Sequence, residues 1–140
     1  MINPRLTPEL KCDDYEKSLN FYTEVLGFNV LYKREDHGFA MMEYQGAQLM
    51  IDRDDHYFAD LHHGSEKPYG RGVNLQIETD DVTALLDRVN ASSWPVTYEI
   101  EEAWYKTGDV EAGNKQFVIQ DPDGYLLRFF EDLGERPVKR

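Results

Sequence analysis

The sequence predicts an α+β protein built from two β-α-β-β-β modules, and three observations support this fold class. A short strand and an amphipathic helix near the N-terminus are followed by three strand-like runs. The same order returns in the second half, which is the pattern of an internal repeat. The last two runs flank an Asp-Pro-Asp-Gly turn and predict a hairpin. Hairpins this frequent argue against a single doubly wound parallel sheet.

The first module begins with a strand at Glu9-Leu10-Lys11-Cys12 and continues into a helix expected near 13–26. Asp13 or Asp14 is suited to cap the N-terminus of this helix, and Gly27 is suited to end it. Three strand-like runs follow at about 28–34, 38–44 and 47–53, separated by Gly38 and by Gln45-Gly46.

The second module repeats the capping pair and the apolar spacing of the first helix. Asp13-Asp14 recurs as Asp80-Asp81, and Tyr15 corresponds to Val82. This predicts a second helix near 80–91 after a strand at 73–77, with further strands at about 96–101, 115–120 and 125–131. The helical residues expected to pack inward are Tyr15, Leu19, Tyr22, Val82, Leu86 and Val89.

The length of 140 residues predicts a single domain spanning 1–140. Its expected parts are module one at about 3–53, a linker at about 54–70, module two at about 71–133 and a loosely held tail at 134–140. A second irregular stretch is expected at about 102–114, where Trp104-Tyr105 stands among charged residues. A Trp on a mobile loop usually covers something, so this loop is a candidate ligand contact.

The net charge and the apolar content of the sequence argue against several classes of binding partner. A formal net charge of −12 argues against nucleic acid and anionic membranes, which bind through Lys and Arg. No apolar run reaches membrane-spanning length, the N-terminus has no signal-peptide pattern, and Cys12 is the only cysteine. These features predict a cytoplasmic protein without an intramolecular disulfide, in which Cys12 is a small buried strand residue.

Arg128 is the most informative single residue of the terminal hairpin. Tyr125, Leu127 and Phe129 share one face of its second strand, whereas Leu126, Arg128 and Phe130 share the other. An arginine between apolar neighbours must reach water, a carboxylate or a ligand, because burying its charge unpaired is costly.

The hairpin Asp121-Pro122-Asp123-Gly124-Tyr125 and the helix sequence Ser18-Leu19-Asn20-Phe21-Tyr22 resemble motifs of a known superfamily. It is the glyoxalase, bleomycin-resistance and extradiol-dioxygenase superfamily, also called the vicinal-oxygen-chelate fold. The resemblance covers nearly the whole chain. It implies two curled mixed sheets around a cleft that is completed within a homodimer, and it is closest to metal-free, bleomycin-resistance-like members.

The same resemblance places the metal ligands of metal-dependent members at Thr7, at Met50 or Asp52, at Asn74 and at Arg128, where those members carry a glutamate. Of these, only Asp52 offers a carboxylate, and a guanidinium remains protonated. We therefore expect no metal and no other cofactor. His56, His62 and His63 form a His-rich linker that is either simply solvated or gathered by a loop into a site.

Strand parity places Thr7, Glu9 and Lys11 opposite the core-facing Leu10 and Cys12. Glu9 is then expected in one cavity with Arg128, either as a structural ion pair or beside a ligand anchor. Asn74 and Gln76 share a face and are suited to bind a ligand or each other. The candidate ligand-binding residues are Glu9, Asp52, Asn74, Trp104, Tyr105 and Arg128.

The favoured function is therefore a bleomycin-resistance-like protein that sequesters a small molecule, expected to be cationic and aromatic, in a dimer cleft without metal. The alternative is a glyoxalase- or dioxygenase-type lyase or isomerase with an atypical site. Such a site would combine Asp52 and Glu9 with a linker histidine. A dimeric scaffold with a vestigial cleft is a third interpretation.

Overall fold

The computed structural model describes residues 4–53 and 73–138, and this part of the chain forms eight strands and two α-helices. They follow one another in the predicted order, with four strands in each of two sheets. The chain divides into two compact units. The first comprises Met1–Val73 with Asp121–Tyr125, and the second comprises Asn74–Gln120 with Leu126–Arg140. The predicted α+β class is confirmed.

The first unit contains one helix and a mixed sheet. Its elements are β1 (Glu9–Lys11), α1 (Tyr15–Asn20), β2 (Asn29–Arg34), β3 (Phe39–Tyr44) and β4 (Ala47–Asp52). The strand order is β1-β4-β3-β2, with β1 parallel to β4 and antiparallel pairing elsewhere. Gln45-Gly46 and a short 3₁₀ turn ending at Gly38 supply the connections, as the turn residues predict.

The first helix begins with a side-chain cap and changes its winding near its middle. Asp14 accepts a hydrogen bond of 3.1 Å from the backbone N–H of Lys17. After Asn20 the chain widens into a π-helical turn at Phe21–Val25, in which the N–H of Leu26 donates to the carbonyl of Phe21 at 3.1 Å.

The buried side chains of this segment differ in part from the predicted inward-facing residues. Phe21 and Tyr22 are both buried, as are Tyr15 and Ser18. Leu19, which was expected to pack inward, is only half-buried. The apolar periodicity of the helix does not predict that Ser18 is buried, because serine is polar. Its hydroxyl can be buried only with a hydrogen-bond partner, and that partner, Asp123, is 105 residues away in sequence.

The second unit has the same order of elements. They are β5 (Asn74–Glu78), α2 (Val82–Ala91), β6 (Tyr98–Thr107), β7 (Val110–Gln120) and β8 (Leu126–Pro137). The sheet order is β5-β8-β7-β6, and β5 runs parallel to β8. Asp81 caps α2 by accepting from the N–H of Ala84 at 3.0 Å. Val82, Leu86 and Val89 are buried, as predicted.

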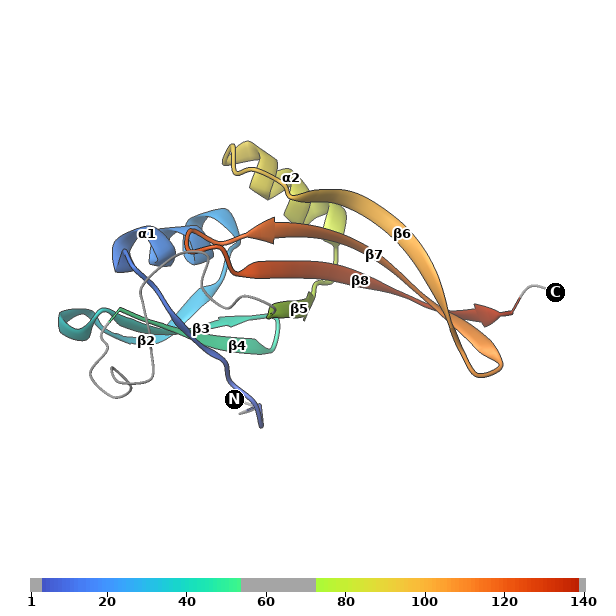
Figure 1. The fold of residues 1–140 in the computed structure, drawn as a ribbon, viewed down its shortest axis with the longest axis horizontal. Coiled ribbons are helices and arrows are strands. Elements are labelled where there is room, and N and C mark those ends of the chain that lie inside the picture. The colour runs from blue at the N-terminus through green and yellow to red at the C-terminus, as the bar shows by residue number, and fades with distance from the viewer. Residues whose placement is uncertain (1–3, 54–72, 139–140) are drawn as a thin grey trace. The chain divides into compact units, whose positions relative to one another are not determined.

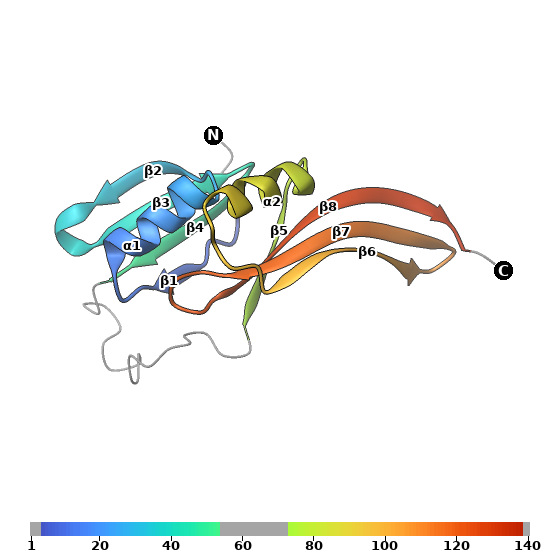
Figure 2. The same cartoon turned by 90° about the horizontal axis from the view of Figure 1, so that it is seen from above.

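Two irregular segments of the prediction are strands. The stretch 102–114 belongs to the β6–β7 hairpin, and β8 runs to Pro137 through most of the expected tail. Figures 1 and 2 show β6, β7 and β8 continuing together beyond α2. Within the described part of this unit, α2 does not cover the extension. The strands of the extension carry charged residues on both faces and lack the apolar alternation that marks a half-buried strand.

Cys12 follows β1 and is buried with its thiol free, as predicted. Burial, reinforced by the negative charges of Asp123, Asp52 and Asp121, raises the pKa of this thiol to about 12. It therefore stays protonated and unreactive at neutral pH. Within the described residues, no helix combines the length and apolarity that crossing a membrane requires.

Candidate functional site

The turn at 121–125 belongs to the first unit, where it is bound to the first helical segment. Tyr22 donates a hydrogen bond of 2.8 Å from its hydroxyl to Oδ2 of Asp121. Ser18 donates from Oγ to Oδ2 of Asp123 at 3.2 Å, and the backbone N–H of Asp13 donates to Oδ1 of the same residue at 3.2 Å. The two motifs that carry the family resemblance therefore contact each other directly.

Asp121 also organises the backbone of its own turn. Its Oδ1 accepts hydrogen bonds from the N–H groups of Asp123 at 2.8 Å and Tyr125 at 3.0 Å. Burial raises the pKa of Asp121 to about 6, although the hydrogen bonds from Tyr22 and from these two N–H groups lower it. Because its oxygens are engaged within the fold, we assign Asp121 a structural role.

Arg128 lies on the face of the second sheet that is opposite to the buried Leu127 and Phe129. Gln76 is its register partner on β5, and Asn74 lies two residues before Gln76. Nε of Arg128 donates to Oδ1 of Asn74 at 2.9 Å, and Nη2 donates to Oε1 of Gln76 at 3.4 Å. The prediction that Asn74 and Gln76 share a face is confirmed.

This arrangement puts a cation at one of the positions considered for a metal. Arg128 is half-buried and bonds to the side-chain oxygen of Asn74, which occupies another of the implied ligand positions. Amide oxygens are neutral, so the guanidinium keeps its full positive charge, which opposes a divalent cation nearby. In residues 4–53 and 73–138, no group of three or more His, Cys, Asp or Glu side chains could hold a metal ion. The residues present do not fit a family-type metal site.

On the first unit, Glu9 and Asp52 share the open face of the sheet. Glu9 pairs with Met50 in register, and Lys11 pairs with Asp52. The residues of the opposite face, Leu10 and Ile51, are buried, so the predicted parity is confirmed. Glu9 is exposed and Asp52 is half-buried. Because Glu9 and Arg128 belong to different units, their shared cavity stays a prediction.

An aromatic and cationic cluster lies on that same open face. The rings of Tyr32 and Phe39 stack at a centroid distance of 5.9 Å. The guanidinium carbon of Arg34 lies 4.8 Å from the ring centroid of Phe39 and 5.6 Å from that of Tyr32. The sequence pattern does not point to this cluster, because a β-bulge after Val30 shifts the register of β2 against β3.

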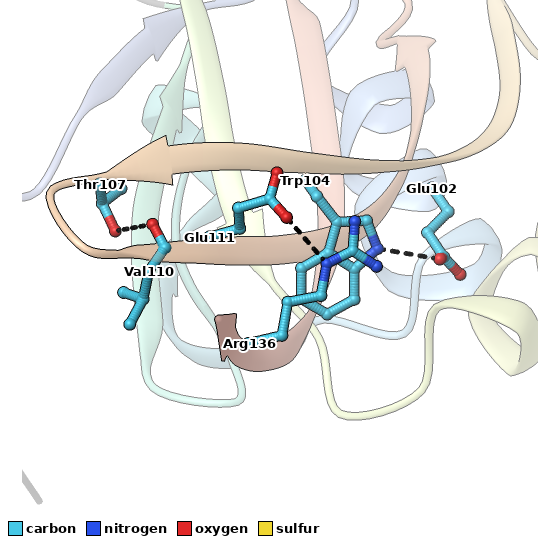
Figure 3. Close-up of polar contacts among 6 residues, drawn as sticks. All are labelled: Glu102, Trp104, Thr107, Val110, Glu111 and Arg136. Carbon is cyan, nitrogen blue, oxygen red and sulfur yellow. Dashed lines mark hydrogen bonds and ion pairs between the residues drawn. The ribbon is translucent and has the colours of Figure 1, made fainter. Parts of the chain in front are cut away.

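Trp104 lies inside a strand and not on a loop (Figure 3). Its indole N–H donates to Oε2 of Glu102 at 3.0 Å, and the guanidinium carbon of Arg136 lies 3.9 Å from its ring centroid. Arg136 also pairs with Glu111 at 3.1 Å. A Cβ added to Gly113 would lie 2.5 Å from the ring, so the indole rests directly against that backbone.

The prediction of a mobile loop is therefore wrong. Trp104 belongs to β6 and contacts both β7 and β8. The hairpin end near it is held by the Thr107 hydroxyl, which donates to the carbonyl of Val110 at 3.5 Å (Figure 3). Tyr105 points to the other face by alternation and is 56% exposed. A ligand-binding role for Trp104 and Tyr105 stays a prediction, but the mobile loop on which it was based is a strand. His56, His62 and His63 lie outside the described residues.

Comparisons with known proteins agree with the architecture. A sequence model of the family described as the Glyoxalase/Bleomycin resistance protein/Dioxygenase superfamily matches residues 7–129. A Vibrio cholerae protein named probable lactoylglutathione lyase is 30% identical over 132 residues, covering 88% of this chain and 86% of that protein. The lactoylglutathione lyase of Haemophilus influenzae is 28% identical, with 91% of each chain covered.

Solved structures extend this likeness to the fold. An integron cassette protein of Vibrio cholerae matches with a TM-score of 0.68 over 94% of this chain and 96% of its own. Its sequence identity is 18%, so this similarity concerns the arrangement of strands and helices.

Proposed function

Because this chain belongs to the glyoxalase/bleomycin resistance protein/dioxygenase superfamily, we propose that it binds a small molecule on the open face of β5 and β8 without a divalent metal. The observation that supports this proposal is the hydrogen-bonded group of Arg128, Asn74 and Gln76. In this group Arg128 and Asn74 occupy two of the positions where the family resemblance implies metal ligands, and Gln76 is a second amide partner of the cation.

A fixed guanidinium offers part of what a metal offers. It supplies a permanent positive charge and directional donors that can orient an oxygen-bearing ligand. It does not supply an exchangeable coordination position, so water cannot be activated there as it is on a metal. This chemistry suits binding and orientation more directly than it suits metal-type catalysis.

Two finer functions remain as proposals. The names of the curated relatives favour a lyase over antibiotic sequestration, since both relatives named above are described as lactoylglutathione lyases. A lyase in this chain would need an acid or base outside the arginine group. Glu9 and Asp52 on the open face of the first sheet are the candidates for that role.

Metal analysis of the purified protein is the direct test of metal-independent binding. We expect substoichiometric nickel, zinc and iron, and no rise in melting temperature when these ions are added, since a tightly bound ion would stabilise the folded state. Near-stoichiometric metal in the isolated protein would contradict the proposal.

The lyase candidate is tested by following the formation or breakdown of lactoylglutathione with chelator-treated protein. Activity that survives chelation and is lost in Glu9→Gln or Asp52→Asn would support a metal-independent lyase. Activity that appears only when a divalent ion is added would contradict metal-independent function. A protein that lacks activity but binds small molecules would fit sequestration.

A further inference from the structure

We propose that Arg128 anchors an oxyanion, so that the ligand of this site carries a carboxylate or a phosphate next to an apolar body. This inference deepens the proposed function and rests on it. It is at odds with the cationic ligand that the net charge of −12 suggests.

The first step concerns which donors of Arg128 are in use. A guanidinium has five N–H donors arranged along two edges. The amides of Asn74 and Gln76 accept from Nε and Nη2, which form one edge. Among the described residues, no carboxylate forms an ion pair with Arg128, and the Nη1–Nη2 edge keeps the parallel donors that match an oxyanion in bidentate geometry.

The second step concerns charge. Both partners of Arg128 are neutral amides, so neither cancels its charge. Glu78 is the carboxylate on the same strand and face as these amides, but its register partner is Phe130, two pairs beyond the pair of Gln76 with Arg128. Arg128 is half-buried, and partial exclusion of water strengthens its attraction for an anion.

The third step concerns orientation. An arginine side chain is long and loses considerable rotamer freedom when a ligand fixes it. Hydrogen bonds to two side chains of the adjacent strand restrict that freedom before a ligand arrives, which raises affinity. An arginine that served only solubility would gain little from two such partners.

The fourth step identifies the body of the ligand. Leu126 and Phe130 flank Arg128 on the same face of β8, and Val118 is its register partner on β7. Leu126 and Phe130 are half-buried and Val118 is buried. A cation with apolar side chains beside it on its own strand and on β7 is complementary to an anion with an aromatic or aliphatic group attached.

The experiment compares matched probes with the intact protein. Benzoate and phenyl phosphate carry the anion and the ring, benzamide and benzylamine carry the ring without the anion, and inorganic phosphate carries the anion alone. Binding is followed by the Arg128 Nε–H resonance in ¹⁵N NMR and by melting temperature. We expect benzoate or phenyl phosphate to shift this resonance at millimolar concentrations, and the stronger of the two identifies the oxyanion.

Variants separate the anchor from the fold. Arg128→Lys keeps the charge but loses the planar fork, and it should weaken binding of the better probe about ten-fold or more. Asn74→Ala should weaken it less, by releasing the orientation of the guanidinium. The matched control is Arg34→Lys, which changes an arginine of the other sheet that contacts aromatic rings, and it should leave the affinity unchanged.

Several results would overturn the inference. Benzamide or benzylamine binding as tightly as benzoate, unchanged benzoate affinity in a folded Arg128→Lys variant, or no response to any anionic probe would each do so. The first of these would leave metal-independent binding on this face intact. Stoichiometric metal that shifts the Arg128 resonance would instead contradict the proposed function itself.

Discussion

The Tyr22 hydroxyl donates a hydrogen bond of 2.8 Å to the buried carboxylate of Asp121, 99 positions later in the sequence. Ser18 makes the corresponding contact with Asp123, which is also buried. A buried carboxylate is tolerated only when donors surround it, and these donors come from the helix motif. The two sequence motifs are therefore the two halves of one polar cluster, which explains why neither is informative alone.

Tyr22→Phe should destabilise the protein by about 1–3 kcal/mol, because it leaves an oxygen of a buried carboxylate without its donor. Chemical denaturation at neutral pH measures this loss. Tyr15→Phe is the matched control, since Tyr15 is equally buried but donates over a longer 3.3 Å to the carbonyl of Phe39. Equal losses in the two variants would contradict a special role for the contact with Asp121.

Stability should depend on pH through Asp121. Unfolded aspartate loses its proton near a pH of about 3.9, whereas the folded pKa of Asp121 is about 6. The folded state therefore holds this proton more tightly, and the contribution to stability is present below pH 4 and lost as the pH rises through 6.

Asp121→Asn removes this titration while keeping an acceptor for the two backbone N–H groups. The free energy of unfolding of the wild type, relative to this variant, should fall by on the order of 2–3 kcal/mol between pH 4 and pH 7. Urea denaturation at several pH values measures the difference, and effects of other titrating groups largely cancel. A difference that does not change with pH would show that the pKa of Asp121 is not raised.

The sequence predicted those helices and strands that bury one apolar face, because such elements show a periodic apolar pattern. The repeat of Asp13-Asp14 as Asp80-Asp81 correctly located both helices, and in each pair the second aspartate is the cap. The extension of β6 to β8 was not predicted, because its strands are held by cross-strand contacts such as that of Trp104 with Arg136. Such contacts join residues far apart in sequence and leave no periodic pattern.

The candidate site was predictable only in its local features. Parity placed Asn74, Gln76 and Arg128 on open faces, because alternation is a local property of a strand. The bonds between them depend on β5 lying beside β8 in a particular register, which a single sequence does not specify.

Gly113→Ala should destabilise the β6–β8 extension, because its new Cβ would lie 2.5 Å from the Trp104 ring. Overpacking of this kind costs about 1–3 kcal/mol. The same substitution in a Trp104→Ala background should cost much less, since the obstructing ring is gone. Equal costs in both backgrounds, measured by thermal unfolding, would show that the indole does not rest against this backbone.

We expect a symmetric homodimer in solution. Among the described residues, the outermost strands are β1 and β2 in the sheet of the first unit and β5 and β6 in that of the second. A strand edge that stays unpaired favours pairing with another chain. Light scattering at micromolar concentration should give about twice the chain mass of 16.4 kDa. A monomer mass would contradict this expectation.

Arg128→Glu should separate ligand binding from stability. Arg128 donates to the exposed amides of Asn74 and Gln76, and each amide can rotate to present its NH₂ group to a glutamate instead. The loss in unfolding free energy should therefore stay within about 1 kcal/mol, as for other solvent-exposed polar pairs. Benzoate binding should be abolished, because a carboxylate would then face the anion. Denaturation and NMR titration of the same sample measure both effects. A large loss of stability would instead identify Arg128 as a structural residue, and retained benzoate binding would remove it from the site.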